Sequence, residues 1–141
     1  MITHEDLSAR QEICDLLVAY ATALGERDWA AYRACFTADA HIDYTSAGGV
    51  AGSVDDALAW LEPTFAMFDV TTAQITNVVV RLESPQRAAV RCMFHTVMRI
   101  PGAGGAQPSY IRAGGHYDDT VVASAGTWRI ARRTEQLAFA Q

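Results

Sequence analysis

Residues 87–123 read RAAVRCMFHTVMRI, then PGAGGAQP, then SYIRAGGHYDDTVVA, and this stretch decides the fold class. Polar and apolar side chains alternate on both sides of the Gly- and Pro-rich centre, which is the period-two pattern of two strands joined by a connection. The residues before and after continue the alternation. Short turns between long strands imply antiparallel neighbours. We therefore expect four such strands, at Thr72–Glu83, Arg87–Ile100, Ser109–Ala123 and Thr127–Phe139.

The N-terminal half has instead the three- and four-residue spacing of apolar side chains that is typical of helices. N-cap signals occur at Thr3 with Asp6, at Asp28 and at Ser53. Pro63 is expected to kink or interrupt the last helix. These signals predict helices over residues 5–24, 29–36 and 54–68, with a short strand over 41–44.

Together the patterns predict an α+β protein in which three helices pack on one face of a curved antiparallel sheet. No repeat or linker interrupts the chain, so we expect a single domain over residues 1–141. The chain is 50% hydrophobic and 19% charged, which excludes a disordered or low-complexity protein.

The charged residues exclude several functions. All 11 basic residues are arginine, so catalysis through a lysine Schiff base is excluded. The net charge of −5 and the scattered arginines argue against nucleic-acid binding. No apolar run reaches the length of a membrane span, and the N-terminus carries acids where a secretory signal carries basic residues, so a cytoplasmic protein is expected. No two histidines have metal-ligand spacing with a carboxylate on one face, so no metal site is predicted.

Alternation along the strands predicts which side chains face the helices. Gln74, Tyr117 and Asp119 fall on this inner face, as does Arg132, whereas His95 falls on the outer face. A register slip or a bulge would exchange the two faces, and the pair of glycines at 114 and 115 is a candidate bulge.

Several short motifs follow one another along the chain: Leu16-Leu17-x-x-Tyr20, Arg27-Asp28-Trp29, Phe36–Ala40, Asp43-Tyr44, a Gly-rich loop, Thr72–Asn77, Gly114-Gly115-x-Tyr117-x-Asp119 and Gly126–Ile130. Their order resembles the SnoaL-like branch of the nuclear transport factor 2-like superfamily, and most of all scytalone dehydratase and the bile-acid 7α-dehydratase. The resemblance covers nearly the whole chain. It implies a cone-shaped fold, with a bent sheet wrapped round three helices and a pocket between them.

The resemblance carries over unevenly to the functional positions. Tyr44 matches a tyrosine that scytalone dehydratases point at substrate, and Tyr20 matches the first-helix tyrosine of the bile-acid dehydratase. The family's aspartate after the first helix falls at Gly25, and the family's histidine falls at Gln74. This chain therefore lacks the pair that normally supplies the acid–base chemistry.

The leading hypothesis is an isomerase, dehydratase or cyclase that acts without a cofactor on a hydrophobic cyclic carbonyl compound, such as a polyketide or steroid-like ligand. Asp119 would be the base, or His95 if the register shifts, with Tyr20 and Tyr44 as oxyanion donors. Asp119 has an alternative role as a buried brace paired with an arginine such as Arg132. The residues expected to contact substrate are Gln74, Trp60, Phe65, Phe94 and Tyr117.

Two other functions stay open: a ligand-binding module without catalysis, and an accessory subunit such as the β subunit of ring-hydroxylating dioxygenases. A cavity filled by side chains would favour the accessory subunit. An open cavity without a titratable group would favour the binding module, and one with a perturbed carboxylate would favour the enzyme. The predicted outer face carries Ile75, Val79, Met93, Val97 and Ala131, which is apolar enough to predict a homodimer through this face.

Overall fold

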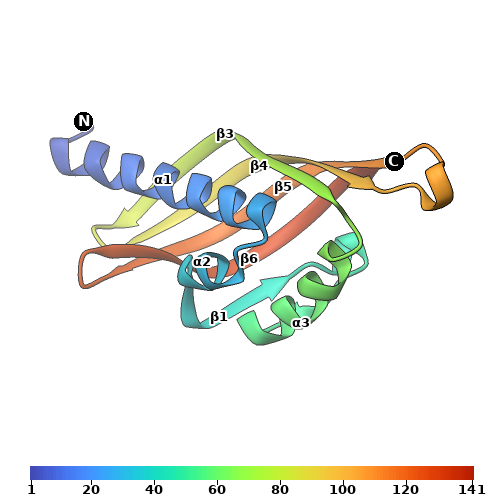
Figure 1. The fold of residues 1–141 in the computed structure, drawn as a ribbon. Helices are drawn as coiled ribbons and strands as arrows, with labels where there is room; N and C mark the ends of the chain where they lie inside the picture. Colours follow the sequence, from blue (N-terminus) through green and yellow to red (C-terminus); the bar gives the residue numbers. More distant parts are fainter.

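The structure is a computed structural model that describes all residues, 1–141, and it confirms the α+β class (Figure 1). Three helices pack against a six-stranded sheet. None of the helices combines the length and the hydropathy that a membrane-spanning helix requires. The elements in chain order are α1 (His4–Glu26), α2 (Trp29–Ala34), β1 (Phe36–Asp43), the 3-10 turn η1 (Thr45–Ala47), β2 (Ala51–Gly52), α3 (Val54–Phe65), β3 (Val70–Ser84), β4 (Arg87–Ile100), the 3-10 turn η2 (Ala103–Gly105), β5 (Ser109–Ser124) and β6 (Thr127–Ala140).

The helices begin where the N-cap signals predict. The Thr3 hydroxyl accepts a hydrogen bond from the backbone N–H of Asp6, whose carboxylate accepts one from the backbone N–H of Thr3. Ser53 and Asp56 form the same reciprocal capping box at α3. Each box satisfies two backbone donors that a helix start leaves unpaired. Pro63 lies inside α3, near its end, and the helix stops at residue 65 rather than at 68.

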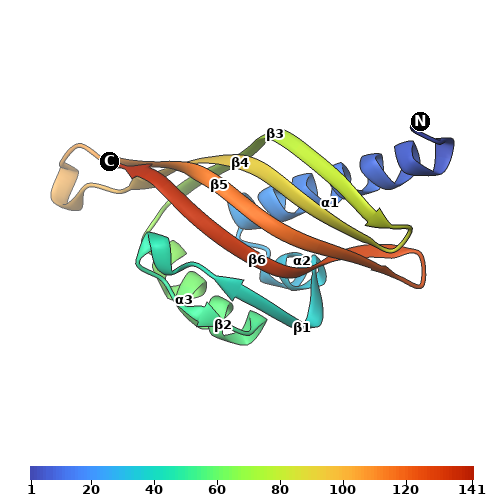
Figure 2. The ribbon, with the colours of Figure 1, turned by 180° about the vertical axis from the view of Figure 1, so that it is seen from behind.

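The sheet has the strand order β2-β1-β6-β5-β4-β3. The four long strands form a continuous antiparallel meander, as expected from their short connections. The expected short strand at 41–44 is longer, because β1 begins at Phe36 and pairs with β6. This pairing is parallel, so the prediction of a wholly antiparallel sheet is wrong at this position and the sheet is mixed (Figure 2).

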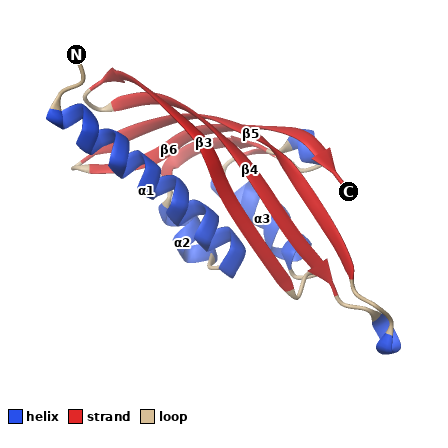
Figure 3. Cartoon of the chain, turned by 90° about the horizontal axis from the view of Figure 1, so that it is seen from above, coloured by secondary structure: helices blue, strands red, loops and turns tan.

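All three helices lie on the concave side of the sheet, and the opposite face of β3–β6 is left uncovered (Figures 2 and 3). The buried apolar core lies between these two layers. Residues from α1, α2 and three strands of the sheet are among its completely buried members: Ile13, Leu17, Tyr32, Ile42, Val121 and Ile130.

Two bulges change which side chains face the core. Thr76 pairs with Met93 and Val79 pairs with Arg91, so β3 carries one extra residue beside Asn77, whose φ is 52°. On β6, Ala131 is the extra residue between Ile130 and Arg132. Each insertion exchanges inner and outer faces along the strand.

A third bulge lies beside Gly114 and Gly115, where the sequence predicts one. Gly115 pairs with Leu137 and Gly114 with Phe139, so the extra residue, Ala138, lies on β6. A Cβ on Gly115 would lie 2.1 Å from the carbonyl oxygen of Gln136, which no side chain can occupy. This position therefore requires glycine.

Candidate active site

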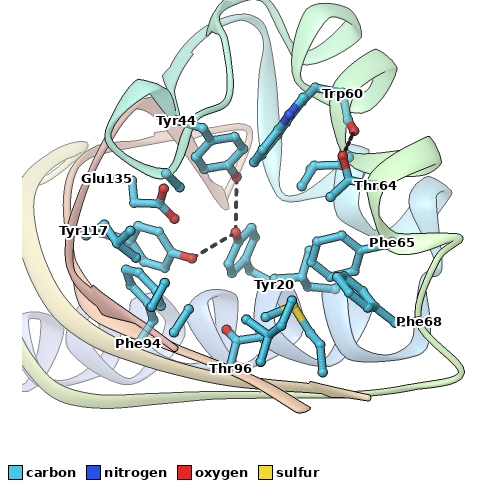
Figure 4. A pocket seen from close by; sticks show the side chains of 18 residues that line it. Tyr20, Tyr44, Trp60, Thr64, Phe65, Phe68, Phe94, Thr96, Tyr117 and Glu135 are labelled. Carbon is cyan, nitrogen blue, oxygen red and sulfur yellow. Dashed lines mark hydrogen bonds between the residues drawn. The ribbon is translucent and has the colours of Figure 1, made fainter. Parts of the chain in front are cut away.

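A cavity of about 240 Å³ opens between the helices and the concave face of the sheet (Figure 4). Eighteen residues line it and 15 of them are hydrophobic. They come from the C-terminal half of α1, from Tyr44 and the η1 turn that follows it, from α3 and the residues just after it, and from β4, β5 and β6. The cavity therefore occupies the place that ligand sites favour, between helix and sheet, with few polar groups.

Four tyrosine hydroxyls form a chain along one wall. The hydroxyl oxygens of Tyr32 and Tyr44 lie 2.7 Å apart. The Tyr44 oxygen lies 3.1 Å from the Tyr20 oxygen, and the Tyr20 oxygen lies 3.3 Å from the Tyr117 oxygen. Tyr20, Tyr44 and Tyr117 line the cavity, whereas Tyr32 lies behind them. Burial raises the pKa of all four phenols above its ordinary value. They therefore stay protonated at neutral pH and act as hydrogen-bond donors.

A fully buried ion pair supports this wall from behind. The Arg133 guanidinium donates to both oxygens of Asp119, at 2.8 and 2.7 Å, and both side chains have no exposed surface. The guanidinium carbon lies 4.0 Å from the centre of the Tyr20 ring and 3.9 Å from that of Tyr117. These distances are those of cation–π contacts. The pair therefore fixes the two rings whose hydroxyls enter the chain.

Glu135 supplies the one carboxylate among the lining residues. It projects from β6 toward the tyrosine hydroxyls, and its residue is only 8% exposed (Figure 4). Its side chain accepts no hydrogen bond and forms no ion pair, and its Oε1 is fully buried. Burial raises the pKa of Glu135 to about 7, although the nearby Arg133 charge opposes the shift. A carboxyl group with such a pKa can take up and release a proton near neutral pH.

Six of the predicted site residues meet at the cavity. They are Tyr20, Tyr44, Trp60, Phe65, Phe94 and Tyr117.

The other three predicted site residues lie elsewhere. Asp119 faces inward as expected, but it is held by Arg133 behind the tyrosines and does not line the cavity. The expected partner Arg132 is wrong, because the bulge at Ala131 turns it outward, where it is exposed. Gln74 is also exposed, since the bulge at Asn77 exchanges the faces of β3, so its predicted inward position is wrong. His95 lies on the outer face, next to Phe139, and no register shift brings it inward.

Sequence reasoning missed Glu135 for the same reason. Strict alternation from Trp128 and Ile130 places Glu135 on the outer face, and the extra residue at Ala131 places it on the inner face. The only local signal is that Glu135 is the one acidic residue of β6, and that signal does not show which face the acid takes.

Residues 5–134 match the SnoaL-like domain family. The chain belongs to this family. The SnoaL-like chain is 30% identical to an uncharacterized protein of Mycobacterium tuberculosis over 139 residues, which are 99% of this chain and 92% of the relative.

Solved structures agree with this assignment and confirm the nuclear transport factor 2-like fold. A candidate scytalone dehydratase from Novosphingobium aromaticivorans superposes with a TM-score of 0.85 at 22% identity, over 97% of this chain and 89% of that one. A hexachlorocyclohexane dehydrochlorinase from Novosphingobium barchaimii superposes with a TM-score of 0.79 at 14% identity, over 97% and 91%. These likenesses establish the fold of the SnoaL-like chain and not its reaction.

Proposed function

We propose that this SnoaL-like protein is an enzyme that removes a proton from a small hydrophobic cyclic carbonyl compound, by acid–base chemistry without a cofactor. The observation that carries the proposal is the unpaired carboxylate of Glu135, which faces the tyrosine hydroxyls across an apolar cavity. An open cavity with a perturbed carboxylate favours an enzyme over an accessory subunit, whose cavity would be filled.

The proposed reaction begins when the ionised Glu135 takes a proton from the carbon next to the carbonyl group. The C–H bond breaks, its electron pair becomes part of an enolate, and negative charge develops on the substrate oxygen. A hydroxyl of Tyr20, Tyr44 or Tyr117 donates a hydrogen bond to this oxygen and stabilises the charge. Return of the proton to another carbon gives an isomer, and loss of a group from the β carbon gives an elimination product.

The base is assigned to Glu135 in place of Asp119 and His95. Both oxygens of Asp119 are occupied by Arg133, and the residue has no surface in the cavity. His95 is on the opposite face of the sheet. Elimination is the form of the reaction that the structural neighbours support, since one is a candidate dehydratase and another a dehydrochlorinase.

Proton abstraction can be tested without knowledge of the natural substrate. A simple cyclic or aromatic ketone is incubated with the protein in D₂O, and exchange of its α protons is followed by NMR. We expect catalysed exchange that falls by roughly two to four powers of ten in Glu135→Gln. Glu62→Gln, an exposed glutamate on α3, is the matched control and should exchange as fast as the wild type. Binding of the ketone without exchange would instead assign the chain to the non-catalytic binding modules.

We also propose that two copies pair through the uncovered face of the sheet. Val79 and Met93 are exposed there, at 64% and 45%. Ile75, expected on this face, packs against the core instead, because of the bulge at Asn77. Light scattering after size exclusion should give the mass of a dimer, and Met93→Asp should give the monomer. A monomeric wild type at micromolar concentration would refute the pairing.

A further inference from the structure

We infer that the substrate of this cavity is an uncharged molecule, about the size of one substituted ring, that presents a single acceptor oxygen to the tyrosine hydroxyls and bears no carboxylate or phosphate. The inference rests on the proposed function in so far as it takes the cavity for the site of reaction. It is carried by the volume of the cavity, by the number of phenolic protons in its wall and by the sign of its charge.

The volume limits the substrate to a small molecule. The cavity of about 240 Å³ lies below the range of about 300–1,000 Å³ that is usual for drug-sized ligands. An apolar cavity of about 150 Å³ is known to bind benzene, so this cavity accommodates roughly ten non-hydrogen atoms. A ring with a two- or three-atom substituent fits inside this volume, whereas a fused tricyclic compound would extend through the opening of the cavity.

The number of phenolic protons determines how many hydrogen-bond acceptors the substrate needs. Tyr32 is fully buried, and the Tyr44 hydroxyl is its one hydrogen-bond partner, so Tyr32 must donate to Tyr44 to avoid an unpaired buried donor. The two remaining contacts, Tyr44 with Tyr20 and Tyr20 with Tyr117, use two of the three other phenolic protons. One proton is therefore left on a tyrosine that lines the cavity. A single acceptor oxygen on the substrate satisfies it.

The charge of the site excludes anions. Among the lining residues there is no arginine and no histidine. The Arg133 guanidinium is bound to Asp119 behind the tyrosine rings, and the Arg27 guanidinium donates to the backbone carbonyls of Phe65 and Phe68. When Glu135 is ionised, it and the Asp119–Arg133 pair together carry one net negative charge. A substrate carboxylate would lose its hydration and meet a like charge, without a cation to balance it.

Cations fit the site poorly as well, although the sign of the charge is favourable. An ammonium group has no lone pair to accept the spare phenolic proton. The faces of Tyr20 and Tyr117, which could otherwise hold a cation, already cover the Arg133 guanidinium. These two features favour an uncharged acceptor over an amine.

The test compares probes that share one ring and differ in charge or in the oxygen. Dissociation constants of acetophenone, ethylbenzene, benzoate, benzylamine and the larger ketone anthrone are measured by NMR titration at about pH 8, above the pKa of about 7 of Glu135. Acetophenone should bind most tightly. Ethylbenzene, which lacks the acceptor, should bind about tenfold more weakly, and benzoate about a hundredfold more weakly. Anthrone, part of which would remain outside the cavity, should bind more weakly than acetophenone.

Two variants separate charge from shape. In Glu135→Gln, benzoate should gain at least about tenfold in affinity, because the like charge is removed. In Glu62→Gln all affinities should equal those of the wild type.

Several results would overturn the inference: benzoate or anthrone binding as tightly as acetophenone, benzylamine binding more tightly, or no probe binding at all. The proposed function fails separately. Selective binding of acetophenone without exchange of its α protons would refute the enzyme and leave the inferred ligand class intact. Exchange together with equal binding of benzoate would refute the ligand class and leave the enzyme.

Discussion

Replacement of Asp119 by asparagine should destabilise the fold far more than the same replacement at its neighbour Asp118. Each carboxylate accepts two hydrogen bonds from one arginine, at 2.8 and 2.7 Å from Arg133 and at 2.7 and 2.9 Å from Arg91. The two pairs have the same geometry and opposite surroundings. The Arg133–Asp119 side chains are 0% exposed, and the Arg91–Asp118 side chains are 59% and 44% exposed.

The expected magnitudes follow from this difference in burial. Removal of one partner of a buried ion pair leaves an uncompensated charge and costs about 3–5 kcal/mol. An exposed pair contributes about 0.2–1 kcal/mol, because water replaces the lost contact. The asparagine amide would also point N–H donors at the guanidinium donors of Arg133. For a chain of this size the larger loss corresponds to a fall in Tm of about 10–15 °C.

Urea titration followed by tryptophan fluorescence measures both losses. A second variant, Asp119→Leu with Arg133→Met, should recover much of the stability, because apolar residues of similar volume often replace a buried ion pair without loss. A loss below about 1 kcal/mol in Asp119→Asn, equal to that in Asp118→Asn, would mean that the pair is solvated. The bulge at Ala131, and with it the inward position of Glu135, would then be wrong.

Three further predictions concern the cavity and its support. Folding raises the pKa of Glu135 from 4.5 to about 7, so the native state binds the extra proton and the free energy of unfolding falls as pH rises between these values. Glu135→Gln should therefore be more stable than the wild type by about 3 kcal/mol at pH 8 and equal to it at pH 4. The rate of α-proton exchange by the wild type should rise with pH through about 7. A pH-independent difference in unfolding free energy between the two proteins would contradict this. Tyr44→Phe leaves the buried Tyr32 hydroxyl without its partner, so urea titration should show a free energy of unfolding lower by about 1–3 kcal/mol. A second change, Tyr32→Phe, should restore most of this loss, because it removes the unpaired hydroxyl. No recovery in the double variant would refute the hydroxyl chain. Gly115→Ala places a Cβ 2.1 Å from the Gln136 carbonyl oxygen, whereas the atoms nearest to a Cβ on Gly114 belong to the movable Phe139 ring. Circular dichroism should therefore show a Tm for Gly115→Ala well below that of Gly114→Ala. Equal Tm values would count against the close approach of β5 and β6.

Much of the site follows from local signals in the sequence. Tyr20 and Tyr44 are marked by the family motifs, and the faces of β4 and β5 follow strict alternation, which correctly turns Phe94 and Tyr117 inward and His95 outward. Alternation is reliable on these two strands because they pair with each other residue for residue, without a bulge.

The acid of the candidate site is the part that alternation misplaces. Glu135 and Arg133 are turned inward, and Gln74 outward, by single extra residues at Ala131 and beside Asn77. Nothing in the local pattern of apolar residues marks either insertion.

The sequence by itself determined the helix starts, the four long strands and the SnoaL-like family, because caps, turns and period-two alternation act over a few neighbouring residues. The tertiary structure alone decided which carboxylate enters the cavity and which is held behind it. A bulge exists only in relation to the partner strand, since it is the pairing of β6 with β5 that leaves Ala131 unmatched. That one unmatched residue gives Asp119 the buried Arg133 as its partner and leaves Glu135 unpaired in the cavity.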